Sequence, residues 1–140
     1  MKKVLFACIH NAGRSQMAAA LFNVLADPDK ARGISAGTQP GEHVHPIVVI
    51  VMQELGIDLT KGRPRLLTQQ VAGEASLLIT MGCGEACPVV PGLKREDWPL
   101  EDPKNKPIER VREIREEIRQ KIEILVTVNG WERTSNAAKQ

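Results

Sequence analysis

The sequence predicts an α/β fold, in which helices cover both faces of a parallel sheet. Two observations support this prediction. Short apolar runs alternate with helical patterns along the chain, and the first such run passes through a short loop directly into a helix. With 140 residues, 42% hydrophobic and 26% charged, the chain suits one compact domain. We expect that domain over residues 1–131 and a flexible polar tail over residues 132–140.

The first half of the chain contains two candidate strands and two candidate helices, each bounded by turn-forming residues. The strands are expected over residues 4–7 and 33–36. The helices are expected to begin at Ser15 and at Pro46, which suits a first turn, and Gly56 is placed to end the second. The apolar face of the first helix is expected to carry four side chains: Met17, Leu21, Val24 and Leu25.

The second half contains the clearest helical pattern. Apolar residues recur at three- and four-residue intervals after Pro107, which can occupy the first turn, and Asn129-Gly130 ends the pattern. These residues are Ile108, Val111, Ile114, Ile118, Ile122 and Leu125. Before it we expect a short helix over residues 68–74, a buried strand over 76–81 and a long loop over 88–107 with a brief strand at 94–97.

Composition excludes several classes of protein. The net charge is only +2 and the pI about 8.5, without a basic block, so no nucleic-acid partner is expected. No apolar stretch approaches the length of a membrane span, and the first residues are too short for a signal peptide, so we expect a cytoplasmic protein. Three cysteines, Cys8, Cys83 and Cys87, favour reactive thiols or metal ligands over a disulfide framework.

Cys8 stands at the start of a loop suited to binding an anion. Five residues separate it from Arg14-Ser15, and this segment lies between a strand and a helix start. Backbone N–H groups of such a loop can point inward, and the helix dipole reinforces them. The same field stabilises a thiolate, Arg14 adds a two-pronged donor, and Ser15 can donate to the sulfur. The residues expected to bind the oxyanion are Ile9, His10, Asn11, Ala12, Gly13 and Arg14.

Simpler interpretations exist for several of these residues. Cys8 could be a small buried residue and Arg14 a surface charge. His10 could orient substrate or be a solvated loop residue, while His43 and His45 are expected to cap a helix or face solvent. Asn11 suits a left-handed or side-chain-bridged position, and Gly13 removes a Cβ where the backbone approaches substrate.

The motifs resemble those of the low-molecular-weight protein tyrosine phosphatase superfamily, and specifically its thiol-dependent arsenate reductase branch. The matching segments, in order, are Cys8 to Ala18, Ser35 to Thr38, Glu54 to Asp58, Thr80 to Cys83, Cys87-Pro88, and Trp98 through Asp102-Pro103. The resemblance implies a three-layer α/β/α fold with a four-stranded parallel sheet. It also implies that Cys8 is the nucleophile, that Asn11, Arg14 and Ser15 belong to the anion loop, and that Asp102 is the general acid.

A carboxylic acid near the loop also makes chemical sense, because the oxygen displaced from an oxyanion is a poor leaving group until it is protonated. Asp97 and Glu101 are rival carboxylates in the same segment. From the residues alone, an Asp-Pro turn facing solvent is as good an explanation of Asp102. Only the resemblance selects Asp102 among the three.

The resemblance favours arsenate over a phosphotyrosine substrate. The phosphatases carry a tyrosine after the Asp-Pro pair and aromatic walls around the ring, whereas this chain has no tyrosine and Lys104 follows Pro103. Cys83 and Cys87 supply thiols that hydrolysis does not need. We therefore expect reduction of arsenate to arsenite by a thiol/disulfide cycle, with hydrolysis of phosphate monoesters as the alternative.

The source of electrons is left open by the sequence. Cys83 lies closer than Cys87 to the expected strand end, so we expect it to reach Cys8, with Cys87 as the resolving thiol. Only three residues separate Cys83 and Cys87, fewer than in thioredoxin-coupled members, and a small thiol attacking the arsenic adduct directly is the alternative. The expected reductant is thioredoxin, or mycothiol or glutathione with a glutaredoxin.

No tightly bound cofactor or metal is expected. Ala19 occupies the place where some members carry an acidic residue that binds potassium. Two other classes of protein remain as alternatives: a zinc protein using Cys83 and Cys87 with Cys8 or His10, and an oxyanion-sensing module without turnover.

Overall fold

A four-stranded parallel sheet with strand order β2-β1-β3-β4 lies at the centre of the protein. The structure is a computed structural model that describes residues 1–82 and 90–133. The strands are β1 (Lys2–Cys8), β2 (Ala31–Gly37), β3 (Leu77–Thr80) and β4 (Lys94–Asp97). Cys8 pairs with Gly37 at the end of β2, and Thr80 pairs with Asp97 at the end of β4. The predicted parallel sheet is confirmed, and its strands end at one common edge.

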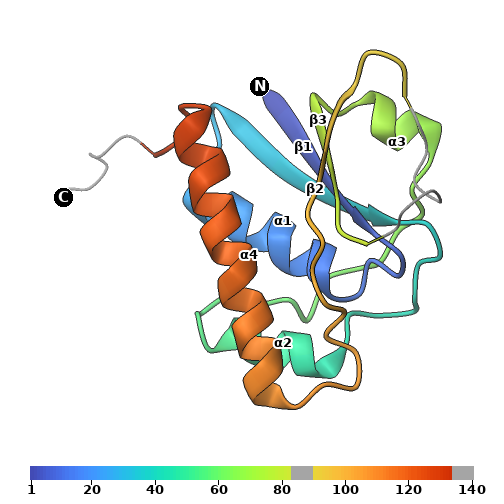
Figure 1. Cartoon of the computed structure of the whole chain (residues 1–140), viewed down its shortest axis with the longest axis vertical. Coiled ribbons are helices and arrows are strands. Elements are labelled where there is room, and N and C mark those ends of the chain that lie inside the picture. Colours follow the sequence, from blue (N-terminus) through green and yellow to red (C-terminus); the bar gives the residue numbers. More distant parts are fainter. Residues whose placement is uncertain (83–89, 134–140) are drawn as a thin grey trace.

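Helices cover both faces of this sheet (Figure 1). They are α1 (Arg14–Leu25), α2 (Pro46–Gln53), α3 (Gln69–Gly73) and α4 (Ile108–Val128). Successive side chains of β1 alternate between two hydrophobic clusters. Val4 and Phe6 pack in the cluster that contains residues of α1, α2 and α4, whereas Leu5 and Ala7 pack in the cluster that contains Ala72 of α3. This alternation produces the three expected layers.

Element boundaries differ from the expected ones by small amounts. Helix α1 begins at Arg14, α2 ends at Gln53, and Pro107 is the residue before α4, with extended backbone, instead of part of its first turn. The prediction for Val24 was wrong: its side chain is 48% exposed. Met17 and Leu21 are buried, but the last turn of α1 lies at the rim of the core, where Arg133 contacts the carbonyl of Val24.

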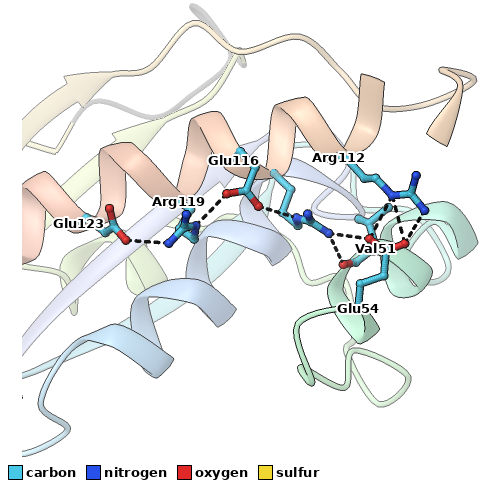
Figure 2. Close-up of polar contacts among 7 residues, drawn as sticks. Val51, Glu54, Arg112, Glu116, Arg119 and Glu123 are labelled. Carbon is cyan, nitrogen blue, oxygen red and sulfur yellow. Dashed lines mark hydrogen bonds and ion pairs between the residues drawn. The ribbon is translucent and has the colours of Figure 1, made fainter. Parts of the chain in front are cut away.

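The end of α2 is fixed to α4 by ion pairs (Figure 2). Glu54 follows the last residue of α2, and its carboxylate accepts hydrogen bonds from Arg112 and Arg115 of α4. Arg115 also donates to the carbonyl of Val51 at 2.8 Å. These hydrogen bonds lower the pKa of Glu54 from 4.5 to about 2. The helix that follows His45 is therefore held in place at its carboxyl end.

The chain after α4 returns to α1. Ala26 forms a β-bridge with Glu132, and Arg133 donates to the carbonyls of Asn23 and Val24. Thus the first two residues of the expected tail contact the domain, while residues 134–140 lie outside the described residues. The division into a domain over 1–131 and a flexible tail stays a prediction. Within the described ranges, no helix is long and apolar enough to cross a membrane.

Candidate functional site

The loop between β1 and α1 holds its carbonyl groups outward. Each carbonyl from Cys8 to Ala12 accepts a hydrogen bond from surrounding structure. The donors, in order, are the N–H groups of Thr38 (3.2 Å), Gln39 (2.8 Å) and Gly41 (2.9 Å), the side chain of Gln16 (3.0 Å) and the N–H of His45 (2.9 Å). In a trans peptide the N–H points opposite to the C=O, so the N–H groups of residues 9–13 turn toward the inside of the loop. The predicted anion cradle therefore has a backbone basis.

Asn11 determines the shape of this loop. Its φ of 51° lies in the left-handed region, and its side chain is fully buried. Its Oδ1 accepts from the N–H of Arg65 at 3.0 Å, which directs Nδ2 toward Ser15, where it donates to Oγ at 2.8 Å. The expectation of a left-handed, side-chain-bridged residue is confirmed on both counts. Sequence reasoning did not identify Arg65 as its partner, because that contact depends on how a distant loop packs.

The Ser15 hydroxyl connects this network to the sulfur of Cys8. The Cys8 Sγ and Ser15 Oγ atoms are 2.8 Å apart, and Cys8 is 2% exposed. Since Asn11 already donates to Ser15 Oγ, the hydroxyl hydrogen of Ser15 is free to point at the sulfur. A hydroxyl in this position can donate a hydrogen bond to a thiolate sulfur and hold it at the base of the loop. The geometry thus supports Cys8 as a nucleophile at the base of the loop.

Arg14 connects the loop to the segment after β4. Its side chain is buried, Nη1 donates to the carbonyl of Leu100 at 2.9 Å, and Nη2 lies 3.7 Å from Asp102 Oδ2. Gly82, with φ of 102°, leaves the space that the guanidinium occupies: a Cβ there would lie 2.5 Å from Nη1. Arg14 is therefore a buried cation held in place, and not the surface charge of the simpler interpretation.

Of the three rival carboxylates, only Asp102 lies beside Arg14 among the described contacts. Asp97 accepts from the hydroxyl of Thr80 at 2.7 Å, and Glu101 pairs with Lys106 and Arg110. Asp102 is half-buried, and its Oδ1 accepts from the N–H of Lys104 at 3.0 Å. The geometry therefore supports the choice that the residues alone left open.

The missing side chain of Gly13 also serves the packing of the loop, a reason that sequence reasoning did not identify. A Cβ at this position would lie 2.9 Å from Pro103 Cγ and 3.4 Å from His45 Cδ2. The missing side chain thus makes room for two neighbouring segments of the chain. Pro103 itself is buried, so the turn that begins at the Asp102-Pro103 pair is packed onto the loop and is not surrounded by solvent.

Two expected features cannot be placed. Cys83 and Cys87 lie outside the described residues, so the proposed relay of thiols stays a prediction. The same holds for a zinc site that uses them. Within residues 1–82 and 90–133, no group of three or more His, Cys, Asp or Glu side chains gathers in a way that could hold a metal ion.

Comparison with known proteins identifies the family. A model of the low molecular weight phosphotyrosine protein phosphatase family matches residues 3–135. The chain belongs to this family. Among curated relatives, a putative arsenate reductase from Halobacterium salinarum is 36% identical, and the match covers 84% of this chain and 85% of that protein. A glutaredoxin arsenate reductase from Synechocystis is 33% identical over 90% of this chain and 97% of its own.

Several solved structures share the fold of this chain. An arsenate reductase from Archaeoglobus fulgidus superposes with a TM-score of 0.78 at 33% identity, covering 89% of this chain and 98% of that one. A thioredoxin-dependent arsenate reductase from Corynebacterium glutamicum gives 0.79 at 39% identity, covering 91% of this chain. This chain spans 61% of the length of the Corynebacterium protein. An arginine phosphatase from Geobacillus stearothermophilus gives 0.80 at 26% identity, covering 93% of this chain and 94% of that one.

Proposed function

We propose that this chain is an arsenate reductase in which the Cys8 thiolate attacks arsenate held in the loop of residues 9–14. The observation that carries the proposal is the contact of Ser15 Oγ with Cys8 Sγ at 2.8 Å, beneath a loop whose carbonyls from Cys8 to Ala12 are held outward. Relatives named arsenate reductases match across most of this chain, which supports the same activity here.

The first step forms a bond between sulfur and arsenic. The Cys8 thiolate attacks arsenic, and the As–O bond to the leaving oxygen breaks. The leaving oxygen is the one that carries the hydrogen of arsenate, so the proton given by Asp102 in its acid form lets it depart as water. Arg14 and the inward N–H groups stabilise the charge on the remaining arsenate oxygens.

The second step reduces arsenic. A second thiol attacks Cys8 Sγ, the S–As electron pair goes to arsenic, and As(V) becomes As(III) as arsenite leaves. Two thiols are oxidised to one disulfide, which an external thiol must reduce. We propose Cys83 as the attacking thiol and Cys87 as the resolving one, with a small thiol acting directly on the arsenic adduct as the alternative. The names of two relatives, one thioredoxin-dependent and one a glutaredoxin enzyme, support an external thiol reductant.

The aromatic residues favour a bare oxyanion over an aryl phosphate. The chain has two phenylalanines, two tryptophans and no tyrosine. These four side chains pack in a row, Trp98 on Phe6, Phe6 on Phe22 and Phe22 on Trp131, with ring centroids about 6 Å apart. Rings packed on one another in the core cannot form the walls of a slot for a phosphotyrosine ring.

Phosphatase activity is the second candidate, because the family is one of phosphatases and an arginine phosphatase shares the fold. A reductant panel separates the two. Arsenate is supplied with thioredoxin, with glutathione and glutaredoxin, or with mycothiol and its glutaredoxin, and an aryl phosphate is tested in parallel. We expect arsenite formation in at least one thiol system and only weak phosphate release. Efficient aryl phosphate hydrolysis without arsenite formation would assign the phosphatase function. We also propose a cytoplasmic location, because the proposed arsenate reduction depends on such reductants.

A further inference from the structure

All three histidines of the chain belong to the segments around the anion loop. His10 lies within the loop, and His43 and His45 lead into α2. The charged and titratable groups that act on His45 are Asp102, Lys104, His10 and His43. Asp102 and Lys104 belong to residues 102–104, called the acid segment below, His10 belongs to the anion loop, and His43 lies two residues before His45. His45 therefore interacts electrostatically with groups of the proposed site.

The side chain of His45 lies where the loop meets the acid segment. Its backbone N–H donates to the carbonyl of Ala12 at 2.9 Å. Its imidazole and the ring of Pro103 both border Gly13, at 3.4 Å and 2.9 Å from the position of an added Cβ. Although His45 is the residue that precedes α2, its side chain makes no capping hydrogen bond. The side chain of His45 therefore does not cap the helix, as one expectation had it, and packs on the loop instead.

The surroundings of His45 favour its neutral form. Burial is the main cause that lowers its pKa below 6.5, and Lys104, His10 and His43 add to the lowering, whereas the carboxylate of Asp102 opposes it. The imidazole is thus mostly uncharged at neutral pH and gains a proton on acidification. The same proton would place a cation beside Gly13 of the anion loop, within range of the charge of Asp102.

We propose that His45 is a positioning residue for Asp102, and that the charge on its imidazole couples oxyanion binding to pH. This inference rests on the proposed function for the role of Asp102 as acid. The neutral ring holds the Asp102-Pro103 segment against Gly13. The protonated ring attracts the bound oxyanion and also pairs with the carboxylate of Asp102, and a carboxylate cannot donate a proton. Acidification therefore tightens oxyanion binding without a matching gain in turnover.

Sulfate binding measures this coupling directly, because sulfate keeps its two negative charges across the range from about pH 5 to pH 8. A Cys8→Ser background removes the titration of the thiol. In this background we expect sulfate to bind about threefold more tightly at pH 5.5 than at pH 7.5, as expected for one partly exposed charge pair. Adding His45→Asn should remove most of this difference. Adding His43→Asn, a matched change at an exposed neighbour, should leave it in place.

Circular dichroism and thermal melting establish that each variant is folded, and His45→Gln replaces His45→Asn if the latter is not. Sulfate binding by the His45 variant with the full pH dependence of its background would overturn the inference. So would loss of that dependence in the His43→Asn or a His10→Asn variant alone. Failure of the parent protein, which retains Cys8, to reduce arsenate would overturn the proposed function. The sulfate titration would still decide the role of His45 in oxyanion binding.

Discussion

Arg14 Nη2 lies 3.7 Å from Asp102 Oδ2, while Nη1 of the same guanidinium donates to the carbonyl of Leu100. The arginine expected to bind the oxyanion thus also holds the segment that carries the proposed acid. A bound oxyanion would share this guanidinium with Asp102. Substrate binding and placement of the acid therefore depend on one planar side chain.

Arg14→Lys is expected to weaken oxyanion binding far more than a change that keeps the charge would suggest. An ammonium cannot serve both Leu100 and the oxyanion with a fixed fork, and one charge-assisted hydrogen bond is worth roughly tenfold or more in affinity. Competitive inhibition of arsenate reduction by phosphate or sulfate measures the effect. Arg63→Lys is the control, since Arg63 is exposed and its side chain contacts the carbonyl of Gly62. Equal inhibition of parent and Arg14→Lys would remove Arg14 from the site.

Asp102→Asn is expected to lower the rate of the first step by about a hundredfold or more, because an amide cannot supply the proton to the leaving oxygen. Sulfate affinity should stay the same or rise, since a negative charge beside Arg14 is removed. Rapid-quench measurement of one turnover provides the rate. Asp97→Asn serves as the matched control, because Asp97 accepts from Thr80 and is not paired with Arg14. A loss in Asp97→Asn equal to that in Asp102→Asn would show that the acid is wrongly assigned.

Gly82→Ala tests how Arg14 is positioned. Both Gly82 and Gly92 have positive φ, 102° and 82°, so alanine strains the backbone at either position by about 1–2 kcal/mol. An added Cβ meets the guanidinium of Arg14 at 2.5 Å at position 82 but has no atom within 4 Å at position 92. We expect both variants to lose stability and only Gly82→Ala to lose sulfate affinity. Sulfate titration of the two folded variants side by side decides the matter, and equal affinities would contradict this account.

Glu54→Gln is expected to change how stability depends on pH. The pKa of Glu54 falls to about 2 in the folded protein because Arg112 and Arg115 donate to it, whereas the unfolded chain titrates near 4.5. A lowered carboxyl pKa stabilises the fold above pH 4.5, and this contribution is lost as the pH falls toward 2. Urea unfolding at pH 7, 5, 4 and 3 should therefore show a gap between parent and variant that narrows with acidification. Glu123 pairs with a single arginine, Arg119, among the described residues, so Glu123→Gln should show a smaller gap. A gap for Glu54→Gln that stays constant with pH would be contrary to this prediction.

Local patterns were sufficient to predict the order of elements and the loop itself. An apolar run before Cys8, a helical pattern after Arg14, and the parallel order of strands placed the loop at the sheet edge. The strand over residues 94–97 and five of the six apolar positions buried in α4 were also predicted. These features depend on spacing along the chain, which the sequence contains directly.

Contacts between distant segments could not be predicted in the same way. The orientation of the Asn11 amide depends on the N–H of Arg65, and the space for Arg14 depends on Gly82. Apart from its place before Pro46, nothing in the sequence indicated that His45 packs on the loop. Each of these relations arises only when separate loops pack at the sheet edge, and no periodicity records which loops meet there.

Cys8 is the thiol that we propose attacks arsenate, and arsenite formation by Cys8→Ser tests this role most directly. The measurement is arsenite formed per enzyme, in whichever thiol system supports the parent protein, for parent, Cys8→Ser and the Cys83→Ser, Cys87→Ser double variant. A serine hydroxyl remains protonated at neutral pH and cannot form a disulfide. We expect no arsenite above background from folded Cys8→Ser, whatever the double variant does. Arsenite formation by Cys8→Ser at a rate close to that of the parent would contradict the account.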